Sequence, residues 1–157
     1  MEIERKFLVR NVPELELYRF HLIEQAYLCT SPVVRVRRQD EEYILTYKGA
    51  GMMAREEYNL PLTRESYEHL IGKADGNIIT KKRYLIPLDE NLKAELDIFE
   101  GKFSGLIIAE VEFPDEESAH DFSAPDWFGE EVTYCPEYHN SALSRTDTWE
   151  PSKSVSP

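Results

Sequence analysis

The chain has 157 residues, of which 41% are hydrophobic and 31% charged, a composition typical of a single globular domain with a buried core. Its formal net charge of −12 disfavours general binding to nucleic acid or to an anionic membrane surface. No apolar run is long enough to span a membrane, and the first residues lack the apolar core of a signal peptide. Cys29 and Cys135 lack the spacing of metal ligands, so we expect two free thiols and a cytoplasmic protein.

The first expected strand covers residues 2–9 (EIERKFLV) and separates charged from apolar side chains. Alternate residues of a strand face opposite sides, so Glu2, Glu4 and Lys6 share one face. Ile3 and Phe7 lie on the other face. For one strand alone, the ordinary interpretation is an edge strand with its charged face in water. The later strands decide whether that interpretation holds.

Six further segments alternate with the same period of two and place β-branched or aromatic side chains on one face. In chain order they are VVRVRR (33–38), EYILTYKG (42–49), AREEYNLPL (54–62), ITKKRYLIPL (79–88), KAELDIF (93–99) and IIAEVEF (107–113). The stretch KGAGMM (48–53) predicts a turn that joins the second and third of these segments into a hairpin.

Helices are expected at three places. TRESYEHLIGKADG (63–76) has Thr63 as its N-cap and Gly76 as the residue that ends the helix. A second short helix is expected after Asp115, and a third within residues 136–145. Residues 151–157 (PSKSVSP) have no apolar periodicity, so we expect a mobile tail after a single domain of residues 1–150.

The charged faces of these strands carry pairs of like charge. Like charges two residues apart on one strand repel each other, and a face in water would normally mix both signs. The repetition therefore favours charged faces that converge on a common ligand. The five pairs are Glu2 with Glu4, Arg35 with Arg37, Lys81 with Arg83, Glu95 with Asp97, and Glu110 with Glu112.

The converging side chains are balanced in charge but differ in what they bind. Arg and Lys bind phosphate oxygens, whereas clustered carboxylates suit a hard divalent cation such as Mg²⁺ or Mn²⁺. A phosphate polyanion with its metal ions therefore fits the pattern. The seven basic residues are Lys6, Arg35, Arg37, Lys48, Arg55, Lys81 and Arg83, and the seven acidic ones are Glu2, Glu4, Glu57, Glu95, Asp97, Glu110 and Glu112.

In this order the motifs resemble the CYTH superfamily, also called the triphosphate tunnel metalloenzymes, over nearly the whole chain. They look most like its small bacterial inorganic triphosphatases. The motifs are E-x-E-x-K (2–6), Q-A-Y-L (25–28), R-V-R-R (35–38), L-T-Y-K-G (45–49), R-E-E-Y (55–58), K-K-R-Y (81–84), E-L-D-I-F (95–99), E-V-E-F (110–113) and W-F-G-E-E-V-T (127–133). The resemblance implies an α+β fold that is mainly antiparallel β, namely an eight-stranded barrel with a charged lumen and helices packed outside.

The resemblance also implies a metal-dependent reaction on a triphosphate, with inorganic tripolyphosphate hydrolysed to pyrophosphate and phosphate. Two Mg²⁺ or Mn²⁺ ions would act, one on the phosphate oxygens and one on the attacking water. Glu57 and Glu95 would orient basic side chains or position water. The implied metal ligands are Glu2, Glu4, Asp97, Glu110 and Glu112, the implied substrate-binding residues are Lys6, Tyr27, Arg35, Arg37, Lys48, Arg55, Lys81 and Arg83, and the implied catalytic residues are Glu2, Glu4, Lys6, Glu57, Lys81 and Glu95.

Several alternatives stay open. The chain could be a class IV type adenylate cyclase, a nucleoside or other organic triphosphatase, or a module that binds polyphosphate without hydrolysing it. Tyr27 could be a packed aromatic residue instead of a substrate contact. The family allows a homodimer, and its C-terminal segment can line one tunnel mouth, although we expect no phosphate contact from His139. Asn59 stands where relatives often have a second acid after Glu57.

Overall fold

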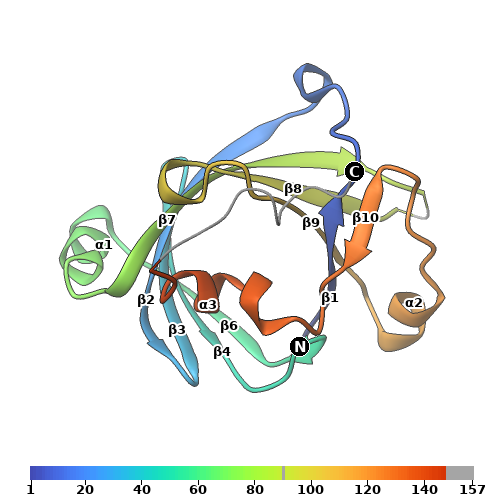
Figure 1. Ribbon diagram of the computed structural model, residues 1–157. Helices are drawn as coiled ribbons and strands as arrows, with labels where there is room; N and C mark the ends of the chain where they lie inside the picture. The colour runs from blue at the N-terminus through green and yellow to red at the C-terminus, as the bar shows by residue number, and fades with distance from the viewer. Residues whose placement is uncertain (90, 148–157) are drawn as a thin grey trace.

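The computed structural model describes residues 1–89 and 91–147, so the expected tail of residues 151–157 lies outside the described residues. Its strands form one antiparallel sheet in the order β10-β1-β9-β8-β7-β2-β3-β4-β6, and β5 pairs with β1. The sheet curls into a nearly closed barrel (Figure 1). The strands are β1 (Glu2–Val9), β2 (Phe20–Thr30), β3 (Val33–Gln39), β4 (Glu42–Lys48), β5 (Ala54–Arg55), β6 (Glu57–Pro61), β7 (Asp75–Pro87), β8 (Lys93–Phe99), β9 (Ile107–Glu112) and β10 (Phe128–Glu131).

Eight strands form the wall as expected, and the two short strands, β5 and β10, both pair with β1. β6 pairs with β4, while the two residues of β5 just before it pair with the start of β1, Arg55 opposite Glu2. The predicted hairpin is confirmed, with Lys48 of β4 opposite Glu57 of β6. Alternation alone missed β2, whose residues 20–24 (FHLIE) do not separate charged from apolar side chains.

The three expected helices are present, with one wrong boundary. α1 (Arg64–Ile71) begins at Thr63, whose hydroxyl oxygen accepts the Ser66 backbone N–H in a capping box. It ends at Gly72 and not at Gly76, because Asp75 already belongs to β7. α2 (Glu116–Asp121) is capped by Asp115, and the C-terminal segment forms η3 (Pro136–Tyr138) followed by α3 (Asn140–Leu143). The remaining short helices are η1 (Leu15–Leu17) and η2 (Gly101–Phe103).

Gly76 instead fixes the C-terminal segment to the barrel. Its φ of +75° lies in the left-handed region, and a Cβ there would come within 2.0 Å of the Ser144 carbonyl oxygen. The next residue, Asn77, donates its backbone N–H to the same carbonyl at 2.6 Å. These contacts hold α3 across one mouth of the barrel (Figure 1).

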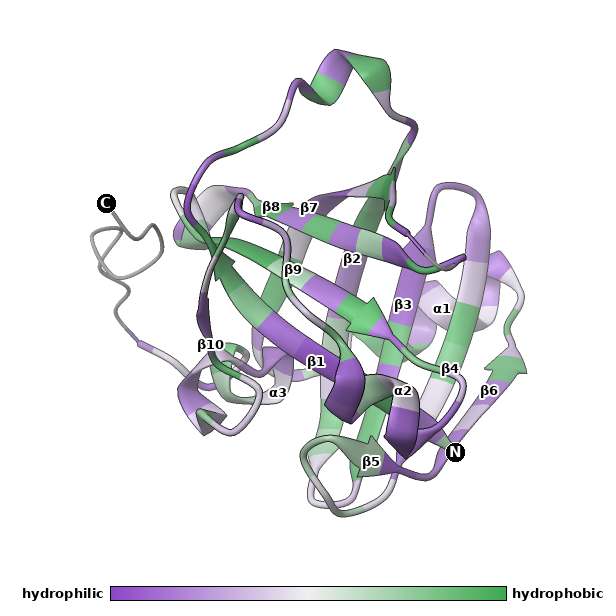
Figure 2. Ribbon diagram, turned by 90° about the vertical axis from the view of Figure 1, so that its right-hand side faces the viewer, coloured by the Kyte–Doolittle hydropathy of each residue, from purple (hydrophilic) through white to green (hydrophobic). Residues whose placement is uncertain are grey.

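The charged side chains face the lumen and one apolar cluster lies outside the barrel, as the alternation predicts. Ile3 and Phe7 of β1 are buried in one cluster with Phe113, Phe128 and Ala119 of α2. A second cluster joins β2, β3, β7, β8 and β9 to Leu143 of α3. It lies on the inward faces of the strands, since Ile79 is opposite Gln25 and Phe99 is opposite Lys81, so apolar side chains fill part of the lumen next to α3. Figure 2 shows the alternation of hydrophilic and hydrophobic residues along the strands. Among the described residues, no helix is both long and apolar enough to cross a membrane.

Candidate active site

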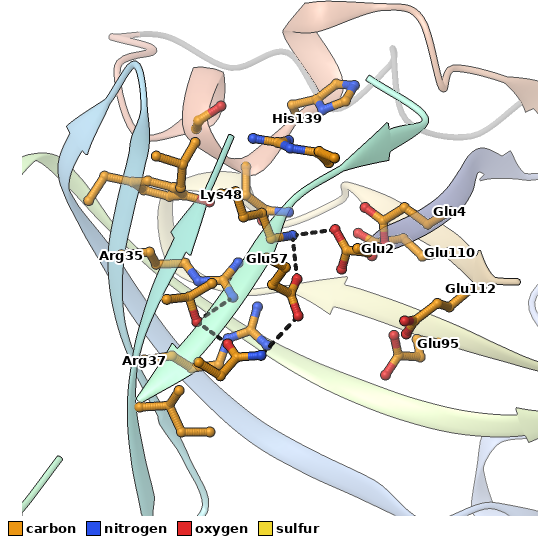
Figure 3. A pocket seen from close by; sticks show the side chains of 18 of the residues that line it. Glu2, Glu4, Arg35, Arg37, Lys48, Glu57, Glu95, Glu110, Glu112 and His139 are labelled. Carbon is orange, nitrogen blue, oxygen red and sulfur yellow. Dashed lines mark hydrogen bonds and ion pairs between the residues drawn. The ribbon is translucent and has the colours of Figure 1, made fainter. Parts of the chain in front are cut away.

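The lumen of the barrel contains a cavity of about 280 Å³ lined by charged side chains. The strand alternation turns these side chains inward, and the antiparallel register brings them level across neighbouring strands. Arg35 and Arg37 lie opposite a group of glutamates in Figure 3. The predicted site residues that line the cavity are Glu2, Glu4, Lys6, Tyr27, Arg35, Arg37, Lys48, Arg55, Glu57, Arg83, Glu95, Glu110 and Glu112.

The acidic side of the cavity is built mainly by β1 and β9. Glu4 is opposite Glu112, and Lys6 is opposite Glu110 in the β1–β9 register. Burial, reinforced by the charge of Glu110, raises the pKa of Glu4 to about 8. Burial also raises the pKa of Glu2 and of Glu112. Carboxylates with raised pKa values are groups that an added cation would stabilise in their ionised form.

Four of the basic residues are paired with carboxylates. Lys6 Nζ lies 2.8 Å from a Glu110 oxygen, and Lys48 Nζ lies 2.9 Å from a Glu2 oxygen. Although burial opposes ionisation, Lys6 and other cations hold the pKa of Glu110 well below its usual range. The other two paired cations, Lys81 and Arg83, share Asp97.

Lys81 and Asp97 do not line the cavity, although they lie on the same inward face as Arg83. Both side chains are completely buried, and their charged atoms are 2.7 Å apart. Asp97 also accepts two hydrogen bonds from the Arg83 guanidinium, at 2.8 and 2.9 Å. The position of Asp97 is therefore that of a support for the basic side chains, whereas the four glutamates of β1 and β9 face the cavity directly.

Arg35 and Arg37 of β3 form no ion pair with a carboxylate among residues 1–89 and 91–147. Arg37 Nε donates to the Gln25 side-chain oxygen at 2.9 Å, and Arg35 Nη2 donates to the Thr46 hydroxyl at 3.3 Å. Burial, with the charges of Arg35 and Arg83, lowers the pKa of Arg37. This part of the wall has positive charge that an anion would neutralise.

The carboxylates fit a divalent cation that takes part of its coordination from substrate and water. Within the described part of the chain, no three acidic, histidine or cysteine side chains converge closely enough to hold an ion alone. Mg²⁺ commonly uses one or two carboxylates and completes its shell with water and phosphate oxygens. Glu2, Glu4, Glu110 and Glu112 offer such carboxylates at one side of the cavity.

Sequence patterns missed several residues of this site. Thr46 and Asn59 line the cavity between the basic strands, and Gln25 supports Arg37 from β2. His139 and Asn140 reach the cavity from the mouth, where Asn140 accepts a hydrogen bond from Lys81 at 3.3 Å. Neutral side chains give no charge signal, and only the position of Gln25 opposite Arg37 in the register would have identified it.

An antiparallel barrel whose lumen holds basic side chains facing carboxylates defines a class of protein that binds a phosphate polyanion in a tunnel. The CYTH domain model matches residues 1–146, and the chain belongs to this family, the triphosphate tunnel metalloenzymes. It is 42% identical to the inorganic triphosphatase of Nitrosomonas europaea over 91% of this chain and 96% of that one. It is 39% identical to the inorganic triphosphatase of Acetivibrio thermocellus over 90% and 92% of the two chains.

A solved structure shares the architecture. The crystal structure of an inorganic triphosphatase superposes with a TM-score of 0.71 at 37% sequence identity, covering 95% of this chain and 97% of that one. The fold expected from the sequence, a mainly antiparallel barrel with external helices, is thereby confirmed.

Proposed function

We propose that this protein hydrolyses inorganic tripolyphosphate to pyrophosphate and phosphate with the help of a divalent cation. The observation that carries the proposal is the division of one cavity between unneutralised arginines on β3 and glutamates on β1 and β9, of which Glu2, Glu4 and Glu110 are buried. A phosphate chain with its metal ion needs both kinds of group at once. The activity named for the two relatives at 42% and 39% identity supports the same reaction.

The basic residues would hold and orient the phosphate chain. Arg35, Arg37 and Arg55 would bind phosphate oxygens through their guanidinium groups, which match the geometry of phosphate. Lys6 and Arg83 would stabilise charge on the leaving phosphate while remaining fixed by Glu110 and Asp97. Preorganised positive charge costs little rearrangement during the reaction, so it lowers the barrier as well as the dissociation constant.

Glu2, Glu4, Glu110 and Glu112 would hold the cation, Mg²⁺ or Mn²⁺, of which we expect two. When bound, these ions neutralise phosphate charge and acidify a water molecule. Glu57 and Glu95 line the same cavity and would keep the neighbouring cations in position, since Glu57 lies 3.4 Å from Lys48 and Glu95 lies 3.6 Å from Arg83. In the reaction, a water oxygen bonds to one terminal phosphorus, the bridging P–O bond breaks, and pyrophosphate leaves with the bond's electrons.

Phosphate release tests the proposal. Tripolyphosphate, ATP and pyrophosphate are each incubated with the protein in Mg²⁺, in Mn²⁺ and in chelator. We expect rapid release from tripolyphosphate only when a metal is present. Faster turnover of ATP would replace the proposal with a nucleotide-directed activity, and product analysis would then separate a cyclase from a triphosphatase. Metal-dependent binding without release from any of the three would identify a binding module.

A further inference from the structure

The basic residues of the tunnel are held in two different ways. Lys6, Lys48, Lys81 and Arg83 each have a carboxylate within 3 Å, so much of their charge is already neutralised. Arg35 and Arg37, which are adjacent on the inner face of β3, are held by neutral side chains. The tunnel has as many acidic as basic residues, so a shortage of carboxylates does not explain why these two arginines have neutral partners.

Gln25 is the neutral partner of Arg37. It lies directly opposite Arg37 in the β2–β3 register and is completely buried. Its side-chain oxygen accepts the Arg37 Nε–H at 2.9 Å, whereas its Nε2 has no hydrogen-bond partner among the described residues. A buried amide with an unpaired N–H is costly, so Gln25 lowers the stability of the fold at this position.

Thr46 and Asn59 support Arg35 in a similar way. Thr46 is opposite Arg35 on one side and opposite Asn59 on the other. Its hydroxyl oxygen accepts from Arg35 and its proton is donated to the Asn59 carbonyl oxygen at 2.6 Å. The Asn59 amide then donates to Glu57 at 2.9 Å. Asn59 thus links Thr46 to Glu57 without placing a second carboxylate next to Arg35.

We propose that Gln25, Thr46 and Asn59 form a neutral frame that positions Arg35 and Arg37 without neutralising them, so that this wall binds a terminal phosphate of the substrate. The frame residues are positioning residues, since none of them needs to touch the reacting atoms. The inference rests on the proposed function for the identity of the anion. A terminal phosphate carries more negative charge than an internal one, so it gains most from cations that have no competing carboxylate.

The Gln25→Glu variant separates neutrality from positioning. Glutamate has nearly the same shape, and it keeps an oxygen in place to accept the Arg37 hydrogen bond. If Gln25 served only to position Arg37, this variant would bind substrate as well as the wild type and would be more stable. If neutrality matters, the new carboxylate competes with phosphate for Arg37 and weakens binding.

Binding is measured by calorimetry with tripolyphosphate in metal-free buffer containing chelator, and KM and kcat are measured separately with Mg²⁺. We expect Gln25→Glu to weaken tripolyphosphate binding and to raise KM by about 10-fold or more, equivalent to ~1.4 kcal/mol, with a smaller change in kcat. Gln25→Met, which keeps neutrality but removes the hydrogen bond, should lie between Gln25→Glu and the wild type. Its free energy of unfolding should not rise, whereas that of Gln25→Glu should.

Asn11→Asp is the control, because it adds the same charge by the same change of amide to carboxylate at an exposed position that does not line the cavity. We expect it to weaken binding by no more than about 2-fold, since screened charges without direct contact interact weakly. Asn59→Asp is a second, independent test on an exposed residue of β6, where a folding defect is not expected. It should raise KM in the same direction as Gln25→Glu.

Two results would overturn the neutral frame. One is binding within 2-fold of the wild type by folded Gln25→Glu and Asn59→Asp. The other is an equal loss in Asn11→Asp, which would show a general effect of charge. If Gln25→Glu does not fold, Asn59→Asp decides alone. Failure of the proposed function can be told apart from failure of the neutral frame. A wild type that binds tripolyphosphate without hydrolysing it would refute the hydrolysis, but binding by the variants could still be compared with it in metal-free buffer.

Discussion

Asp97 on β8 holds Lys81 and Arg83 of β7 together on the inward face of the barrel. The Lys81 ammonium lies 2.7 Å from one Asp97 oxygen, and the Arg83 guanidinium donates to both oxygens at 2.8 and 2.9 Å. Neither Asp97 nor Lys81 has any exposed side-chain surface. Asp97 is therefore bound on both sides by cations, and the geometry gives it the role of a buried counter-ion.

Removing that counter-ion should destabilise the whole barrel. Asp97→Asn leaves Lys81 and Arg83 buried without their carboxylate, and breaking a buried pair in this way commonly costs about 3–5 kcal/mol. We expect a loss of this size in the free energy of unfolding, measured by urea denaturation, with a loss of activity that excess metal does not restore. Glu112→Gln, on the cavity face, is the control and should leave stability unchanged. If Asp97→Asn is as stable as the wild type but needs more metal for activity, Asp97 is a metal ligand and not a buried counter-ion.

Glu4 should make the metal-free protein less stable as the pH rises. Its pKa is raised from 4.5 to about 8 by burial and by Glu110, so the folded state favours the protonated form. Stability from this group is complete below about pH 4.5 and is lost as the pH rises through about 8. The lowered pKa values of Glu110 and Asp97 act in the opposite sense, but only at pH values below the ordinary pKa of these groups. Burial lowers the pKa of Lys81 to about 7, which opposes the Glu4 effect above that pH, so the Glu4 contribution is the difference between the wild type and Glu4→Gln.

Urea denaturation of the metal-free wild type and of Glu4→Gln between pH 5 and pH 9 measures this loss, and the stability of the variant relative to the wild type should rise with pH. The same variant should need at least about 10-fold more Mg²⁺ for half-maximal activity, because a ligand is lost at nearly constant shape. Added Mg²⁺ should stabilise the wild type more at pH 8.5 than at pH 6, where Glu4 holds its proton. If Glu4→Gln needs the same Mg²⁺ concentration as the wild type for half-maximal activity, the assignment of β1 to the metal site is wrong.

Strand alternation was sufficient to predict which side chains enter the lumen. Glu2, Glu4 and Lys6 face inward and Ile3 and Phe7 face outward because period-two patterning fixes the side of every residue once the strand is assigned. Closure of the barrel does not follow from alternation. It depends on the two-residue pairing of β5 with β1, a contact between distant segments that leaves no local pattern.

Charge also predicted which residues meet in the cavity, but it did not predict how they are partnered. Lys81 and Asp97 carry the same motif signal as residues of the lining, yet they do not line the cavity. Which member of a charged face is completely enclosed depends on packing across three strands, β7, β8 and β9. Gln25 shows the converse case, because a neutral side chain without motif chemistry holds one of the main basic residues.

Arg37 and Arg83 should respond in different ways to loss of their charge. Arg37 has no carboxylate partner among the described residues, and its pKa is lowered by burial, Arg35 and Arg83. Arg37→Met should therefore change the free energy of unfolding by no more than about 1 kcal/mol, because relief of repulsion is offset by loss of the hydrogen bond to buried Gln25. KM for tripolyphosphate should rise about 10-fold or more. Arg83→Met removes a cation bonded twice to Asp97, so it should lower stability by about 3 kcal/mol or more.

Thermal and urea denaturation compare the stability of the Arg37→Met and Arg83→Met variants. Phosphate release gives KM and kcat for each. The two substitutions remove the same group from neighbouring positions in one cavity, so each is the control for the other. Equal destabilisation by both would mean that Arg37 is needed for folding and not only for binding phosphate. An unchanged KM in a folded Arg37→Met protein would remove Arg37 from the substrate site and shift phosphate binding toward Arg35 and Arg55.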